Sequence, residues 1–148
     1  MFGVLKGYEN RQDPDLMNEI VLAYLGDCVY ELYVRNLSVA SGKIKTRELS
    51  RISAEHSKAA FQARAMKALE GQLTEAETQV MKRARNKRIT SKPKNAEPME
   101  YKLATAFEAV IGYLYVKGEF GRMEWLIERA LTKIPEEKKD EGEKEERE

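Results

Sequence analysis

Apolar residues recur at helical spacing along most of the chain, and turn-forming residues divide this pattern into segments. The first segment follows Asp13-Pro14-Asp15, which has the features of a helix start: an N-cap aspartate, a proline at the first helical position and an acid in the first turn. The spacing of apolar residues beyond this start predicts a helix over about residues 16–37.

The same spacing predicts further helical segments at about residues 46–69, 74–85, 100–117 and 120–134. Thr46 is expected to cap the first of them and Gly71 to end it, because glycine favours helix C-termini. Thr74 and Glu77 have the spacing of a capping box, and Gly118 is the expected stop of the 100–117 helix. No segment has the pattern of a strand, so the sequence predicts an all-α protein.

Two acidic residues stand inside apolar helical stretches, Asp27 in the first predicted helix and Glu108 in the fourth. An ionised carboxylate is costly to bury without a positive partner, and a metal ion is one such partner. Two solitary acids on two core helices suggest one shared site. Gly26 costs its helix about 1 kcal/mol relative to alanine, so a neighbouring helix or a ligand is expected to approach it closely.

Glu31 follows Asp27 by about one helical turn and precedes Arg35 by four residues. The spacing favours a Glu31–Arg35 ion pair worth a few tenths of a kcal/mol. The alternative is that Glu31 accepts a hydrogen bond behind Asp27 at a metal site.

Two motifs together resemble a known family: Tyr24-Leu25-Gly26-Asp27 and, far downstream, Ala106-Phe107-Glu108-Ala109-Val110-Ile111-Gly112. They are similar to the catalytic domain of the ribonuclease III family, and in particular to its small branch, the Mini-ribonuclease III enzymes. The resemblance extends over about residues 15–133 and implies a homodimeric, all-α, ribonuclease III-like endonuclease domain of about six helices. It implies that Asp27 and Glu108 are catalytic, bind Mg²⁺ and direct hydrolysis of double-stranded RNA, and that the substrate is precursor 23S ribosomal RNA.

Compared with the long-form enzymes of this family, the chain lacks three acids. The positions that hold two upstream glutamates in those enzymes are Ile20 and Ala23 here, and a third acidic position is Thr105. Glu19 is one residue out of register and would face elsewhere on the helix. Only the two motif acids therefore carry over as metal ligands, as in the small branch.

A basic stretch covers residues 82–95, with seven Lys or Arg and no acid. The 148-residue chain has no room for a separate double-stranded-RNA-binding domain, so this stretch is expected to contact phosphates. Asn86 and Asn95 are included among the predicted RNA-binding residues because they look like matching positions of the small branch. The predicted RNA-binding residues are Arg83, Arg85, Asn86, Lys87, Arg88, Lys92, Lys94 and Asn95.

Composition narrows the class of protein. Residues 1–135 are expected to form one catalytic domain of net charge +5, and residues 136–148 a disordered tail with eight acidic and four basic side chains. One cysteine and one histidine exclude a disulfide framework and a Cys/His zinc site, and fit a reducing cytoplasm. No stretch has the pattern of a signal peptide or membrane span.

Two other functions remain open at this point. In the first, Asp27 and Glu108 are structural and the protein is a non-catalytic RNA-binding helical protein. In the second, clustered acids bind a nucleotide triphosphate, and the protein is a metal-dependent nucleotide hydrolase on another all-α scaffold. The retained Asp/Glu pair argues against the first, and the lack of a further acid cluster beside that pair, apart from Glu31, weakens the second.

Overall fold

The computed structural model describes residues 3–88 and 97–134, and these residues contain helices and no strand. Two short 3₁₀ helices are η1 (Pro14–Leu16) and η2 (Glu70–Gln72). The α-helices are α1 (Glu19–Ala40), α2 (Thr46–Ser57), α3 (Ala59–Leu69), α4 (Glu75–Arg85), α5 (Pro98–Lys117) and α6 (Phe120–Lys133). The prediction of an all-α fold of about six helices is confirmed.

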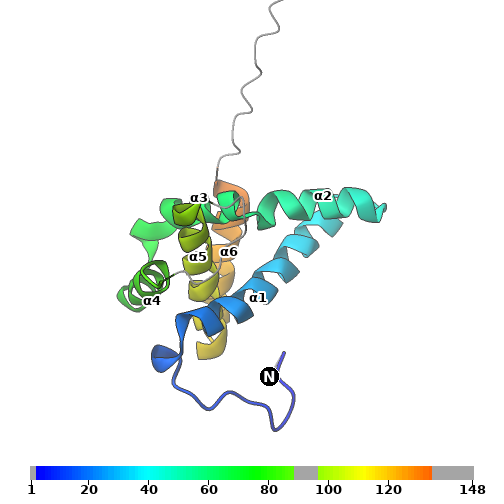
Figure 1. The fold of residues 1–148 in the computed structure, drawn as a ribbon. Coiled ribbons are helices and arrows are strands. Elements are labelled where there is room, and N and C mark those ends of the chain that lie inside the picture. The colour runs from blue at the N-terminus through cyan, green and yellow to red at the C-terminus, as the bar shows by residue number, and fades with distance from the viewer. Residues whose placement is uncertain (1–2, 89–96, 135–148) are drawn as a thin grey trace, which may run out of the picture.

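Helix α5 is the centre of the arrangement (Figure 1). α1 crosses it over a long contact, α3 and α4 pack on it, and α6 runs beside it. α2 packs mainly on α1 and extends to one side, away from α4. Because α5 touches helices on several sides, its side chains are buried around much of its circumference, and it forms the middle of the core.

The core between α1 and α5 is built from apolar and aromatic side chains. Leu22, Tyr30 and Val34 of α1 are completely buried, and the ring of Tyr30 meets that of Phe107 edge to face, with centroids 5.2 Å apart. Edge-to-face pairs add to the stabilisation that burial alone provides. This packing fixes α1 against α5 and hence the motif that each helix carries.

The first helix begins later than predicted. Asp13 does cap a turn, accepting a hydrogen bond from the Asp15 N–H at 2.9 Å, but that turn is only η1 and the chain is extended at Met17. α1 starts at Glu19 with a cap of its own, Asn18. The carboxylate of Asp15 accepts a 2.6 Å hydrogen bond from Tyr113 of α5, a contact that local sequence does not encode.

The helical region predicted at 46–69 is two helices, with a break at Lys58, whose backbone is extended (φ −67°, ψ 149°). A continuous helix would use the His56 carbonyl for its own hydrogen bonding, but that carbonyl accepts a 2.7 Å hydrogen bond from the Tyr30 hydroxyl. The tertiary contact therefore ends α2. Thr46 is the first helical residue and not the cap, which is Lys45 without a side-chain hydrogen bond.

The other predicted helix ends agree better with the structure. The capping box of α4 is present, with both reciprocal hydrogen bonds between Thr74 and Glu77. α5 begins at Pro98, two residues earlier than predicted, and ends at Gly118, whose φ of +79° suits glycine. Glu77 is buried, and its carboxylate accepts a 2.7 Å hydrogen bond from Arg122 Nε. This ion pair joins α4 to α6.

The predicted tail at residues 136–148 lies outside the described residues, as does Pro135 before it. The domain boundary there stays a prediction. Across the described part of the chain, no helix combines the length and the hydropathy that crossing a membrane requires.

Candidate active site

The site is formed where α1 and α5 cross, and two glycines make the close crossing possible. A Cβ atom on Gly26 would overlap the carbonyl oxygen of Glu108 and lie 2.7 Å from the amide nitrogen of Gly112. A Cβ atom on Gly112 would overlap the carbonyl oxygen of Leu22 and lie 3.1 Å from the Gly26 nitrogen. The two helix backbones therefore touch, which is the close approach that the sequence predicted for Gly26.

This crossing brings the two motif acids together. Asp27 is adjacent to Gly26, and Glu108 lies about one turn before Gly112, so both carboxyl groups extend from the point of contact. They are in hydrogen-bonding contact with each other. Asp27 is exposed and Glu108 is half-buried, so the sequence-based expectation that Asp27 itself is buried is wrong. The pairing of the two acids is nevertheless present.

The electrostatics of the pair depend on Glu108. Burial and, next, the negative charge of Asp27 raise the pKa of the Glu108 carboxyl to about 8, against an ordinary value of 4.5. A hydrogen bond from the side chain of Gln62 acts in the opposite direction and lowers it. Without a cation, Glu108 therefore tends to hold a proton near neutral pH.

Gln62 is a residue of this site that the sequence interpretation missed. It lies on α3 and is 2% exposed, between buried Phe61 and Ala63. Its spacing from Ala59 and Met66 places it on the predicted core face of its helix, where an amide is unusual. A polar residue at a core position was the signal that could have identified it.

The donor set suits a hard divalent cation. Mg²⁺ prefers oxygen ligands and is commonly held by one or two carboxylates, together with waters and substrate phosphates. Asp27 and Glu108 supply two carboxylates to such a site. Within residues 3–88 and 97–134 there is no larger group, of three or more His, Cys, Asp or Glu, that could hold a metal ion. The pairing of the two carboxyl groups at the helix crossing supports the fit, because a cation there would take the place of the proton that Glu108 otherwise retains.

Glu31 makes the ion pair that its spacing predicted, with Arg35 Nε 3.0 Å from its carboxylate. The second carboxylate oxygen accepts a 2.6 Å hydrogen bond from Ser57 at the end of α2. The prediction of an ion pair is confirmed. A role for Glu31 behind Asp27 stays a prediction.

The described part of the basic stretch is anchored to the start of α1. The Glu19 side chain is 13% exposed, and its carboxylate forms ion pairs with Arg83 Nε at 2.8 Å and with Lys87 Nζ at 2.9 Å. Lys87 also donates to the side-chain oxygen of Asn18 at 3.0 Å. The Glu19 carboxylate is thus engaged by α4 and the residues that follow it, and it partly neutralises two of the predicted RNA-binding residues.

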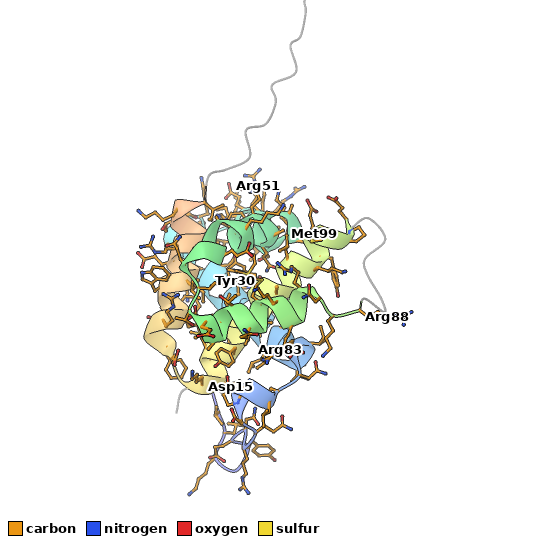
Figure 2. The ribbon with its side chains drawn as sticks, turned by 90° about the vertical axis from the view of Figure 1, so that its left-hand side faces the viewer. Asp15, Tyr30, Arg51, Arg83, Arg88 and Met99 are labelled. Carbon is orange, nitrogen blue, oxygen red and sulfur yellow. The ribbon has the colours of Figure 1, made fainter. Side chains whose placement is uncertain are left out.

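The other predicted RNA-binding residues differ in whether a carboxylate of the protein already pairs with them. Arg85 lies 3.7 Å from the Glu70 carboxylate and also donates to the side-chain oxygen of Asn86. Arg88 is exposed at the edge of the molecule beyond the end of α4, and within the described ranges it has no charged partner (Figure 2). Lys92, Lys94 and Asn95 lie outside the described residues.

Comparison with known proteins identifies the family. The sequence profile of the Ribonuclease III domain matches residues 20–119, a range that contains both motif acids and the two glycines of the helix crossing. The chain belongs to the ribonuclease III family. It is therefore an endoribonuclease of the ribonuclease III type.

The relatives agree in length as well as in sequence. Mini-ribonuclease 3 of Brevibacillus brevis is 40% identical over 124 residues, which cover 84% of this chain and 92% of the relative. Mini-ribonuclease 3 of a Thermoanaerobacter species is 37% identical over 138 residues, covering 92% and 97%. A solved structure of a Fusobacterium nucleatum protein superposes with a TM-score of 0.72 at 29% identity, covering 78% of this chain and 93% of that one. The matches identify the small branch that the two motifs indicated.

Proposed function

We propose that this chain is a Mg²⁺-dependent endoribonuclease that cleaves double-stranded RNA, with Asp27 and Glu108 as its metal ligands. The observation that carries the proposal is the pairing of these two carboxyl groups at the Gly26–Gly112 crossing. Without a cation, the pair is accommodated only while Glu108 keeps its proton, because two ionised carboxylates in contact repel. A cation between them removes that repulsion.

The residues of the chain have distinct parts in this reaction. Asp27 faces solvent, from which a phosphodiester can approach, whereas Glu108 is half-buried at the crossing of α1 and α5. By themselves the two carboxylates would repel an anionic phosphate. Bound Mg²⁺ would supply the positive charge that polarises the phosphate, activates the attacking water and neutralises the leaving 3′ oxygen. No histidine base is required.

Double-stranded RNA is supported as the substrate by the chemistry of the basic stretch. A duplex hides its bases and is recognised by shape, by phosphates and by 2′-hydroxyls, so cations matter more than stacking aromatics. Arg88 extends freely from the end of α4, and the Glu19 carboxylate fixes the positions of Arg83 and Lys87 beside it. We infer that Arg88 is the described residue with the greatest contribution to RNA binding.

A homodimer is supported by an apolar stripe on α1, which consists of Val21, Tyr24, Leu25, Cys28 and Leu32. Val21, Tyr24 and Leu32 are 52%, 83% and 48% exposed, and the spacing of three or four residues puts the stripe on one face of the helix. Asp27 lies on this same helix. A second copy covering the stripe across a two-fold axis would present a second site to the antiparallel strand.

The biological task we propose is maturation of precursor 23S ribosomal RNA in a bacterial cytoplasm. It follows from the likeness to Mini-ribonuclease III. The alternative of a nucleotide hydrolase is weakened because no cluster of three acids is present among the described residues.

The decisive experiment measures cleavage of duplex RNA, single-stranded RNA and free nucleotides with and without Mg²⁺. We expect cleavage of the duplex only, and only with the metal. Asp27→Asn and Glu108→Gln should each reduce the single-turnover rate by at least a factor of about 10³ while leaving circular dichroism unchanged, because both changes keep the shape and remove a ligand charge.

The matched control is Glu100→Gln, which makes the same chemical change on α5 about two turns before Glu108. This variant should cleave like the wild type. Duplex cleavage at a near wild-type rate by either site variant at low Mg²⁺ would contradict the proposed site.

A further inference from the structure

Gln62 is the polar side chain on the buried face of α3. The other buried residues of that helix, Phe61, Ala63, Ala65, Met66 and Leu69, are all apolar. An amide that is 2% exposed needs hydrogen-bond partners in the protein, since water does not reach it freely. The Glu108 carboxylate is the partner that the structure provides.

The contact joins three helices at one point. Asp27 comes from α1, Glu108 from α5 and Gln62 from α3, and α3 packs directly on α5. The Glu108 side chain has several rotatable bonds, and once Glu108 gives up its proton, repulsion from Asp27 favours conformations that turn its carboxylate away. The Gln62 amide on α3 opposes that rotation by hydrogen bonding to the carboxylate.

We propose that Gln62 is a positioning residue of the metal site: its buried side-chain amide holds the Glu108 carboxylate beside Asp27, ready to receive the cation. The inference rests on the proposed function, because it assumes that the two carboxylates bind the metal. It assigns to α3 a part in a site that the motifs place on α1 and α5 alone. Because the described residues bring two acids to the site, the orientation of each one matters for affinity.

The first test measures Mn²⁺ binding to the protein without RNA, by electron paramagnetic resonance of free Mn²⁺. Gln62→Met keeps the length and volume of the side chain and removes the donor. Loss of a group that orients a metal ligand typically lowers affinity by a factor of 10 to 100, so we expect at least about a tenfold weaker Mn²⁺ affinity. The Mg²⁺ concentration for half-maximal single-turnover cleavage should rise similarly, with an unchanged RNA affinity.

Gln62→Glu is the second variant and distinguishes positioning from mere support of the fold. It keeps the shape but adds a carboxylate beside Glu108, so Mn²⁺ should bind more tightly than to the wild type. A merely structural residue would move both variants in the same direction or in neither. The control Met66→Leu alters the packing of α3 one turn further on and should leave metal affinity unchanged.

The outcomes separate this inference from the proposed function. If the wild type binds Mn²⁺, Asp27→Asn loses binding and both Gln62 variants bind normally, then the metal site stands and the role of Gln62 is overturned. If the wild type binds no Mn²⁺ in this assay, the metal site itself is wrong and the inference falls with it. Opposite shifts for Gln62→Met and Gln62→Glu would support it.

Discussion

Asp27 and Glu108 carry the same functional group, but their surroundings give them different properties. Asp27 is exposed, whereas Glu108 is half-buried, lies against Asp27 and accepts a hydrogen bond from Gln62. Burial and the neighbouring negative charge both disfavour the ionised form of Glu108, and the amide favours it. The result is a carboxyl group that is ready to exchange a proton for a cation.

The raised pKa of Glu108 makes the stability of the metal-free protein depend on pH. The pKa is about 8 in the folded chain and about 4.5 as the ordinary value, so between these limits the folded state binds more protons than the unfolded state. Stability should therefore fall as pH rises from about 5 to 8 and be level above that range. Urea unfolding at several pH values in the presence of a chelator measures it.

The matched variant for that experiment is Glu108→Gln, which has no proton to exchange. Its stability should change much less across the same pH range. Added Mg²⁺ should stabilise the wild type at pH 8 more than at pH 6, because the proton competes with the metal. An equal pH slope in wild type and variant would contradict the assigned electrostatics.

At the scale of elements, the crossing of α1 and α5 decides whether the site exists. Gly26 and Gly112 bring the backbones into contact, and the edge-to-face packing of Tyr30 on Phe107 holds the helices at that crossing. Away from the crossing, α4 is fixed to α6 by the buried Glu77–Arg122 ion pair. The rigid elements therefore set the positions of the two acids.

Gly112→Ala tests the crossing. The new methyl group would overlap the Leu22 carbonyl, so the helices must separate, at a cost of about 1–3 kcal/mol for overpacking. We expect a lower melting temperature and a loss of cleavage greater than the loss of folded protein. Thermal unfolding and single-turnover cleavage measure the two effects.

Gly121→Ala is the control for this substitution. Gly121 also lies in a helix, α6, but a Cβ atom there has no neighbour within 4 Å. Alanine should stabilise that helix by about 0.5–1 kcal/mol and leave cleavage unchanged. Two similar outcomes for the two glycines would show that the crossing is looser than described.

At the scale of the whole molecule, positive charge is concentrated where α4 leads into the following segment. Seven basic residues stand in residues 82–95, and Glu19 anchors two of them to α1. The exposed apolar stripe lies on α1 as well. One helix thus connects the site, the proposed subunit interface and the basic stretch.

Neutralising this charge should weaken RNA binding without impairing the chemistry. Replacing Arg88 by Gln removes a cation without a charged partner among the described residues, so the affinity for duplex RNA and the salt slope of binding should both decrease. The slope should fall by about one unit and the rate at saturating RNA should change little. Binding at two salt concentrations and single-turnover cleavage measure these effects.

Lys133→Gln removes the same charge at the end of α6 and serves as the control. Neutralising Arg85, Lys87, Arg88, Lys92 and Lys94 together should enlarge the effect on affinity. A lost rate at saturating RNA with normal affinity would place part of the basic stretch in the active site instead.

The subunit interface is tested by Tyr24→Glu. A charge in the middle of the apolar stripe should be costly to bury, so the dimer should dissociate into monomers and duplex cleavage should fall. Sedimentation velocity at several concentrations measures the mass. Ile44→Glu changes an equally exposed apolar residue outside the stripe and should leave the dimer intact; dimers of Tyr24→Glu would exclude this interface.

The features that the sequence by itself determined are those that depend on neighbours within about one helical turn. The capping box of Thr74 and Glu77, the stop at Gly118 and the Glu31–Arg35 ion pair are of this kind. The two motifs also indicated the family. Gly26 predicted a close helix crossing, because glycine destabilises the interior of a helix unless close packing requires it.

Only the tertiary structure decided the features that join distant parts of the chain. The break between α2 and α3 depends on Tyr30, 26 residues before His56, and the anchoring of Lys87 depends on Glu19, 68 residues away. The greater burial of Glu108 and its contact with Gln62 likewise follow from how α1, α3 and α5 meet. Helical periodicity tells which residues face inward, but the angle and depth at which helices cross determine which of them touch.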